Sequence, residues 1–264
     1  MSIECTRPYM SGLRSNPIFR RMFGDAFPSN TNLAFDLCKR GEVSSSSNVL
    51  HFGCGVGSVS SLINSKFSCS VSGVDVSSPL IEIANSEYAR GSLKFECNSL
   101  HKTSFPESAA THVFTEAILS INRRPVQLFD EIHRCLIGGG FLLNSEIVIT
   151  DSSKLDARVN KFLNIALGDD STYSLDDWKT LLKTNGFDVT QAQIEPSIMR
   201  SNAKKLRRAL FGLNLLRRTK QVSFSELGLG ALEHDFDAIV KSTLTAIDDG
   251  IITYASFISK RKIH

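Results

Sequence analysis

The stretch VLHFGCGVGSVSSL, residues 49–62, decides how this chain folds. It begins as a short apolar run of strand type, and three glycines then fall within five residues, at Gly53, Gly55 and Gly57. Small and apolar residues resume at Ser58 with a helical pattern. A strand that ends in glycines and opens a helix presents backbone N–H groups at the positive end of that helix. The stretch therefore predicts a turn that a ligand approaches closely.

Composition and charge place the chain among ordinary globular proteins. It has 264 residues, 42% of them hydrophobic, and a net charge of +3 from 30 basic and 27 acidic side chains. A nucleic-acid-binding protein typically has a stronger basic excess. No segment reaches the roughly 18 consecutive apolar residues of a membrane span, and the first residues lack the apolar core of a secretory signal. We therefore expect a cytoplasmic protein.

The cysteines do not suggest a metal site. The six are spread along the chain as Cys5, Cys38, Cys54, Cys69, Cys97 and Cys135. None forms a CxxC pair, and no histidine pair has the spacing of zinc ligands. Scattered cysteines of this kind usually behave as small buried apolar residues, so we expect no bound metal.

Apolar runs alternate with helical patterns along the middle of the chain. The runs VLHF, VSGVDV, LKFEC, THVFTE and GGGFLLNSEIVI are each separated by a helical or loop segment. Such alternation is typical of parallel βαβ units and a doubly wound α/β fold. Further along, SLDDWKTLLKTNGF predicts a helix with Ser174 as its N-cap and Gly186 as its stop, followed by a short strand, DVTQAQI.

A second marker supports a nucleoside site beside the glycine turn. The run VSGVDV ends with Asp75, eighteen residues after Gly57. An acid at the carboxyl end of this strand can accept hydrogen bonds from both hydroxyls of a ribose. The glycine pattern is GxGxG, because Ser58 replaces the last glycine of the dinucleotide fingerprint. A lone acid here could also cap a helix, but the two markers together favour ribose binding.

These segments resemble the class I S-adenosylmethionine-dependent methyltransferases. VLHFGCGVG resembles their VLDxGCGxG motif, and GVDVSSPLIEIA resembles their second motif. CNSLHKTSFPESAATHVFTEAI and RCLIGGGFLLNSEI are similar to the next segments of the family. YSLDDWKTLLKTNGF and DDGIITYASFISKR are similar to the small-molecule subgroup, which includes sterol, glycine and antibiotic-sugar methyltransferases. The resemblance covers about residues 48–261.

The resemblance implies a Rossmann-like α/β fold with a mostly parallel, seven-stranded sheet and a helical cap. We expect N-terminal cap helices in residues 1–43 and the cofactor-binding core in 44–194. A helical insertion or lid is expected in 195–249, and the final antiparallel strand of the core in 250–264.

The resemblance also implies S-adenosyl-L-methionine as cofactor and methyl transfer to an O, N or C atom of a small molecule by direct displacement. The positions that match the family's cofactor contacts are His51, Gly53, Cys54, Gly55, Gly57, Asp75, Val76, Asn98, Ser99 and Thr115.

Two of these positions depart from the family pattern. His51 stands where the family has an aspartate that helps to hold the cofactor's ammonium group. Neutral imidazole can accept a hydrogen bond from an ammonium, whereas imidazolium would repel it. We therefore expect cofactor affinity to fall as the pH drops through the titration of His51, unless His51 only packs within the strand. Asn98 replaces an aspartate that binds the adenine amino group. The alternative is a degenerate, non-catalytic protein that binds the cofactor or a partner.

A hydroxyl acceptor would need a general base, and Glu116, after THVFT, and Glu146, in LLNSEIV, are the candidate acids at the carboxyl ends of strands. The resemblance favours Glu116 as the first candidate, because in the family the backbone just past this strand borders the methionine end of the cofactor. His101 and His133 follow, although His101 could be a solvated loop residue and His133 a surface residue of a helix.

The insertion carries a basic segment, AKKLRRALFGLNLLRRTK, in residues 203–220. It has seven Lys or Arg residues and no acid, with leucines at helical spacing. Three interpretations remain: a lid helix over the substrate, a surface for an acidic partner, and a helix on an anionic membrane. A nucleic-acid substrate is not expected, because no NPPY-like motif lies near THVFTEAI.

Overall fold

The computed structural model describes most of the chain. The described ranges are residues 14–26, 30–121, 125–167, 172–218 and 234–263. The segments 1–43, 195–249 and 250–264 therefore lie partly outside the described residues, as do the last two residues of the basic segment 203–220.

The core is one seven-stranded sheet, which confirms the predicted fold class. Its strands are β1 (Asn48–Phe52), β2 (Ser70–Asp75), β3 (Leu93–Cys97), β4 (Ala110–Glu116), β5 (Leu136–Ile149), β6 (Phe187–Ile194) and β7 (Ile252–Arg261). Their order across the sheet is β3-β2-β1-β4-β5-β7-β6. The pairs from β3 to β5 are parallel, and β7 runs antiparallel to both of its neighbours.

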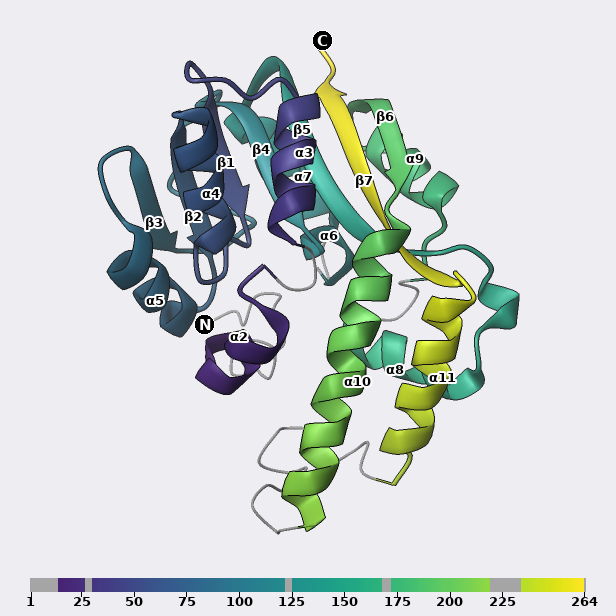
Figure 1. Ribbon diagram of the computed structural model, residues 1–264. Helices are drawn as coiled ribbons and strands as arrows, with labels where there is room; N and C mark the ends of the chain where they lie inside the picture. The colour runs from purple at the N-terminus through teal and green to yellow at the C-terminus, as the bar shows by residue number, and fades with distance from the viewer. Residues whose placement is uncertain (1–13, 27–29, 122–124, 168–171, 219–233, 264) are drawn as a thin grey trace.

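Helices cover both faces of the sheet and extend beyond one of its ends (Figure 1). They are α2 (Pro17–Phe23), α3 (Thr31–Arg40), α4 (Ser58–Phe67), α5 (Ser78–Tyr88), α6 (Ile118–Ile121), α7 (Pro125–Cys135), α8 (Ala157–Leu167), α9 (Leu175–Thr184), α10 (Pro196–Arg218) and α11 (Phe236–Asp248), with a 3₁₀ turn at Ser152–Lys154. In Figure 1, α2, α8, α10 and α11 lie beyond the carboxyl ends of the parallel strands.

Each face of the sheet has its own apolar core, because successive strand residues point to opposite faces. On one face, Leu50, Phe52 and Val113 pack with the buried residues of α7 and α9. On the other face, Val49 and Phe114 pack with the buried residues of α3 and α4. A sheet that is covered on both faces needs near-continuous apolar strands, and this explains the runs seen in the sequence.

Helix α9 shows how local sequence signals determine an element. Ser174 and Asp177 form a reciprocal capping box at its start, as the N-cap prediction required. The chain leaves the helix through Gly186, whose φ of +85° is easily adopted only by glycine. The fully buried Trp178 then donates from Nε1 to the carbonyl of Ile147, 3.0 Å away, and fixes α9 against β5.

A third apolar cluster joins the cap to the sheet. It contains Ile149 and Tyr254 from the strands and Leu163, Ile198 and Ala246 from α8, α10 and α11.

Among the described residues, no helix is both long enough and apolar enough to cross a bilayer.

The glycine turn is packed too tightly for any side chain at its last position. Gly57 has a φ of +84°, and a Cβ built there would lie 2.7 Å from Phe95 Cζ and 2.9 Å from the Ala84 Cβ. Gly57 is therefore required both by its backbone conformation and by the close approach of β3 and α5. Gly91 has a similar φ of +53°, but a Cβ there would meet nothing within 4 Å.

Alanine substitutions at Gly57 and Gly91 distinguish the cost of backbone strain from the cost of steric overlap. Gly91→Ala should lower the free energy of unfolding by about 1 kcal/mol, because only the left-handed backbone is penalised. Gly57→Ala should lower it by about 3 kcal/mol or more, because overpacking adds to the same strain. Urea titration of both variants measures the difference, and equal losses would contradict the proposed overlap.

Candidate functional site

The glycine turn is held against the neighbouring strand by its own backbone. Gly53, Gly55 and Gly57 all have positive φ, of 75°, 54° and 84°. The N–H groups of Gly53 and Cys54 both donate to the carbonyl of Val74, at 2.8 and 3.1 Å. The turn is therefore fixed relative to the end of β2 before any ligand arrives.

Asp75 links the same turn to the start of α5. Its carboxylate accepts from the N–H of Gly55 at 2.9 Å and from the N–H of Ser77 at 3.0 Å. Burial raises the pKa of Asp75, while the positive charge of Arg14 and the backbone hydrogen bonds oppose this rise. Cys54 points the other way, toward Gly73, where any Cβ would lie 2.8 Å from its sulfur.

Arg14 is a residue of this site that sequence reasoning missed. A Cβ built on Gly55 would lie 2.7 Å from Arg14 Nη2, so the guanidinium covers the glycine turn. Its positive charge also acts to lower the pKa of His51 on β1 and that of Tyr254 on β7. An isolated arginine ahead of the first predicted helices carries no motif, and only the folded chain brings it here.

His51 is buried beneath the turn and has one ring nitrogen in use. Its Nδ1 lies 2.8 Å from the Ser60 hydroxyl on α4, and its ring packs edge-on to Phe114. Nε2 is buried and has no hydrogen-bond partner among the described residues. Burial, together with the charge of Arg14, lowers the pKa of His51 to about 3. The ring is therefore neutral across the physiological range, and the expected loss of affinity on protonation of His51 moves to acidic pH, far below an ordinary histidine titration.

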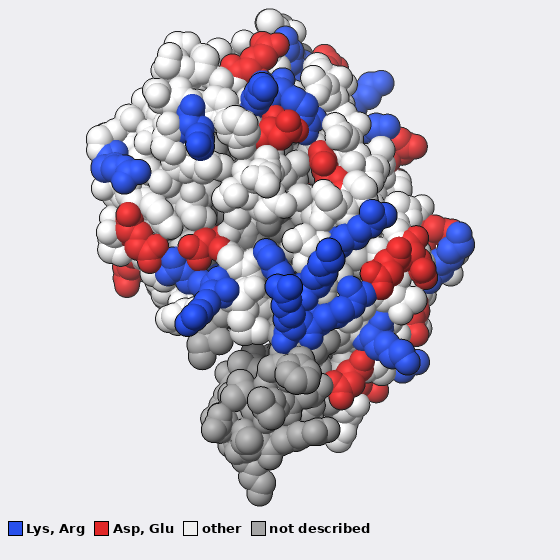
Figure 2. All heavy atoms as spheres, in the orientation of Figure 1, with Lys and Arg blue, Asp and Glu red and all other residues white. Residues whose placement is uncertain are grey.

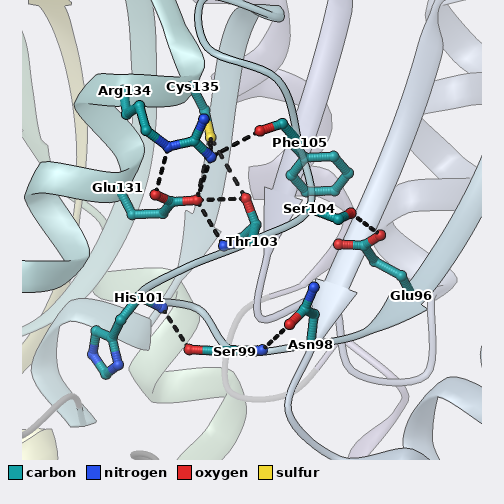
Figure 3. Close-up of polar contacts among 10 residues, drawn as sticks. All are labelled: Glu96, Asn98, Ser99, His101, Thr103, Ser104, Phe105, Glu131, Arg134 and Cys135. Atoms are coloured by element: carbon teal, nitrogen blue, oxygen red, sulfur yellow. Dashed lines mark hydrogen bonds and ion pairs between the residues drawn. The ribbon is translucent and has the colours of Figure 1, made fainter.

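The loop after β3 lies beside this edge (Figure 3). The backbone N–H of Asn98 donates to the carbonyl of Asp75 at 3.1 Å, and its side-chain oxygen accepts from the N–H of Ser99 at 2.8 Å. The Ser99 hydroxyl accepts from the N–H of His101 at 3.1 Å. In Figure 3 the imidazole of His101 points away from Asn98. Val76, which follows Asp75, is half-buried at the same edge.

An ion-pair network on α7 anchors the far end of this loop (Figure 3). Glu131 accepts from both the N–H and the hydroxyl of Thr103, at 2.7 and 2.6 Å, and from Arg134 at 2.7 and 2.8 Å. Arg134 also donates to the carbonyl of Phe105. Burial alone would raise the pKa of Glu131, but the hydrogen bonds from Arg134 and Thr103 outweigh it and lower the pKa to about 2.

The end of β4 sends its last two side chains to opposite faces. Thr115 is fully buried on the face that carries Phe52 and Val113, so only its backbone can reach a ligand at the edge. Glu116 lies on the face of His51 and is half-buried. Its negative charge contributes to raising the pKa of Glu146 and of Tyr254. These three groups therefore lie together around the end of β4.

The structure does not bring His133 to this site. Its ring packs edge-on to Phe187 at the start of β6, and its Nε2 lies 3.0 Å from a Cβ built on Gly186. That contact lies at the amino end of β6, away from Asp75 and Glu116. The helical position was predicted correctly, but the helix ends at the opposite edge of the sheet.

Comparisons with known proteins find similarity in both sequence and fold. A family model described as a methyltransferase domain matches residues 50–144. Phosphoethanolamine N-methyltransferase of Plasmodium falciparum is 28% identical over 126 residues, which are 46% of this chain and 47% of that protein. The chain thus spans about half the length of this curated relative.

Two solved structures show how widely the fold is shared. Phosphoethanolamine N-methyltransferase 2 of Haemonchus contortus, with phosphomonomethylethanolamine and S-adenosylhomocysteine bound, has a TM-score of 0.72 at 18% identity and covers 96% of this chain and 57% of its own. The [4+2]-cyclase SpnF has a TM-score of 0.67 at 19% identity over 89% of this chain and 82% of its own. The sheet order and the matched model lead to one conclusion: residues 50–144 match a methyltransferase domain, and the chain has the fold that these solved structures share.

Proposed function

We propose that the protein transfers a methyl group from S-adenosylmethionine to a small-molecule acceptor. The observation that carries this proposal is the joined unit of the glycine turn and Asp75, whose carboxylate is bonded to the N–H of Gly55. S-adenosylmethionine supplies a methyl group already activated on a sulfonium, so the protein needs to align the acceptor with it and exclude water. Because other reactions occur on this fold, the residues at the site have to support the reaction.

The described residues fit the cofactor in two respects. Of the three positive-φ glycines, Gly55 is covered only by the flexible end of the Arg14 side chain, which an adenosyl group could displace to lie against the backbone there. His51 Nε2 is a buried and unpartnered nitrogen at the same turn, and Ser60 can hold its tautomer so that Nε2 accepts from an ammonium. Asp75 would hold the ribose, Asn98 and Ser99 the adenine, and the backbone of Cys54, Val76 and Thr115 would complete the edge.

Glu116 is the proposed general base for an acceptor that must lose a proton. It is the last residue of β4, on the same face as His51, and the cap helices lie beyond it. A carboxylate there can take the proton of a hydroxyl or ammonium acceptor. His101 sits on the adenine side of the edge and remains a second candidate, whereas His133 is not proposed because of its distance from the edge.

A phosphorylated amine is the first acceptor to test, because the curated relative is named for phosphoethanolamine.

The cytoplasm is the proposed compartment. The described cysteines Cys38, Cys54, Cys69, Cys97 and Cys135 are all free thiols, as in reducing surroundings. Nothing on the site favours the degenerate, non-catalytic alternative, since the glycines and Asp75 are in place.

Cofactor binding tests the proposal directly. Calorimetry with S-adenosylhomocysteine should give a dissociation constant that Asp75→Asn weakens about tenfold or more, because a charged acceptor of two hydroxyl groups is lost. Asp188→Asn, an exposed acid on β6, is the matched control and should bind as the wild type does. Labelled S-adenosylmethionine with phosphoethanolamine, or with a metabolite extract, then reveals the acceptor. Wild-type protein that neither binds nor labels any product would refute the function.

The role of Glu116 has its own test. Glu116→Gln should lower turnover about a hundredfold while the affinity for S-adenosylhomocysteine stays within about twofold, because the amide cannot take a proton. Glu107→Gln, an exposed acid in the loop before β4, should change neither value. Unchanged turnover in Glu116→Gln would remove this residue from the chemistry.

We further propose that α10 acts as a lid over the acceptor site. Ile198, Met199 and Ala203 are buried against the sheet and α11, so the first half of α10 is part of the cap. Lys205 donates to the carbonyl of Phe23 and joins α10 to α2. The exposed basic residues of this half face outward, as Figure 2 shows over the upper part of the helix. They are Arg200, Lys204, Arg207 and Arg208.

Vesicle sedimentation separates the lid from a membrane surface. With α10 serving as a lid, the protein should stay in the supernatant with vesicles of acidic phospholipid at physiological salt. Sedimentation at low salt that is abolished at high salt, and also by charge reversal at Lys204 and Arg208, would instead assign this face to an anionic membrane.

A further inference from the structure

The turn after β4 carries a backbone strain that no glycine relieves. Ala117 follows Glu116 directly and has a φ of 54°, in the left-handed region that residues with a Cβ rarely adopt. The chain then enters the short helix α6 at Ile118. Strained residues persist only when the surrounding structure holds them, and they concentrate at functional sites.

Glu146 holds this turn from the neighbouring strand β5. Its side chain is completely buried. Its carboxyl oxygens accept from the N–H of Leu119 at 3.2 Å and from the N–H of Ser120 at 3.1 Å, and the hydroxyl of Ser120 bonds to the same group. Three polar groups of one turn therefore converge on one side chain.

The backbone of β5 holds the strained residue itself. The carbonyl of Ser145 accepts from the N–H of Ala117 at 2.8 Å and from the hydroxyl of Tyr254 on β7 at 3.5 Å. The side chain of Ile118 lies directly over Gly53, where it would overlap any Cβ. The turn after β4 thus touches the glycine turn on one side and carries Glu116 on the other.

We propose that Glu146 is a positioning residue, which holds the strained turn at Ala117 so that Glu116 faces the acceptor. This inference rests on the base role proposed above for Glu116. Glu146 reaches no reacting atom of its own, because its three hydrogen bonds all go to the turn.

The protonation of Glu146 agrees with this role. Burial raises the pKa of Glu146 to about 8, against the hydrogen bonds from Ser120 and Leu119, and the charge of Glu116 raises it further. Tyr254 faces the same region, and burial with the charges of both acids raises its pKa as well. The raised pKa favours the protonated form of Glu146, whose hydroxyl can donate to Ser120 while the group still accepts from both N–H groups.

Three variants of Glu146 test whether its hydrogen bonds to the turn, rather than its ability to ionise, support turnover. Glu146→Ala and Glu146→Asp should lower kcat about ten- to a hundredfold, because the hydrogen bonds to the turn are lost or cannot reach. The affinity for S-adenosylhomocysteine should stay within about threefold, since Asp75 is untouched. Glu146→Gln should restore part of the turnover, because its amide oxygen can accept from the N–H of Leu119 while its NH2 group donates to the Ser120 hydroxyl. Ser259→Ala removes a buried hydroxyl on β7, away from the turn after β4, and serves as the control for the loss of a buried polar group.

A double-variant cycle decides whether Glu146 acts through Glu116. Turnover is measured with labelled S-adenosylmethionine and the acceptor identified above. Glu146→Ala should cause little further loss in a Glu116→Gln background, because the base is already absent. An equal loss in both backgrounds would overturn the inference and leave the role of Glu116 intact. So would a Glu146→Gln variant as impaired as Glu146→Ala.

Hydrogen exchange gives a readout that does not depend on the reaction. The amides of Leu119 and Ser120 should exchange faster in Glu146→Ala than in Glu146→Gln, while core amides of β1 stay protected. If Glu116→Gln keeps full turnover, the base assignment fails, and the exchange measurement still tests the hold on the turn. Unchanged protection of the Leu119 and Ser120 amides in Glu146→Ala would overturn the inference that Glu146 holds the turn.

Discussion

The hydrogen bonds of the buried Asp75 carboxylate are the interaction on which the rest of the site depends. One oxygen is bonded to the N–H of Gly55 in the turn after β1, and the other to the N–H of Ser77 before α5. A carboxylate can be buried at low cost only where such donors compensate its lost hydration. Two turns from different βα units are thereby held in one fixed arrangement, and the edge proposed to receive the cofactor is preorganised rather than assembled on binding.

The parts of the molecule that follow from local pattern were predictable from sequence. The alternating apolar runs, the Ser174 cap and the glycines each depend on a few neighbouring residues, and Asp75 needed only the spacing of one βα unit. The full Glu131 network was not predictable, because Thr103 reaches Glu131 from a separate segment, whereas Glu131 and Arg134 lie on one helix at i, i+3 spacing. Arg14 lies outside every motif for the same reason.

The side chains of the candidate site show where pattern alone fails. His133 has the right residue type on a correctly predicted helix, yet the direction of α7 carries it to the opposite edge, beside Phe187. Thr115 and Glu116 are consecutive, but strand alternation places the first in the core and the second at the cap. The pKa of His51 could not be predicted either, because it depends on burial beneath the turn and on the nearby charge of Arg14.

The place of β7 in the sheet has a consequence for how the chain comes off the ribosome. β7 lies between β5 and β6, although it follows both in sequence. Until residues 252–261 emerge, β6 has no neighbouring strand, and the outer edge of β5 stays open while α10 and α11 are synthesised. The first half of the sheet can form during translation, but its second half closes only at the end. The nascent protein therefore carries unpaired strand edges, which are sites for aggregation or for chaperone contact, throughout the synthesis of α10 and α11.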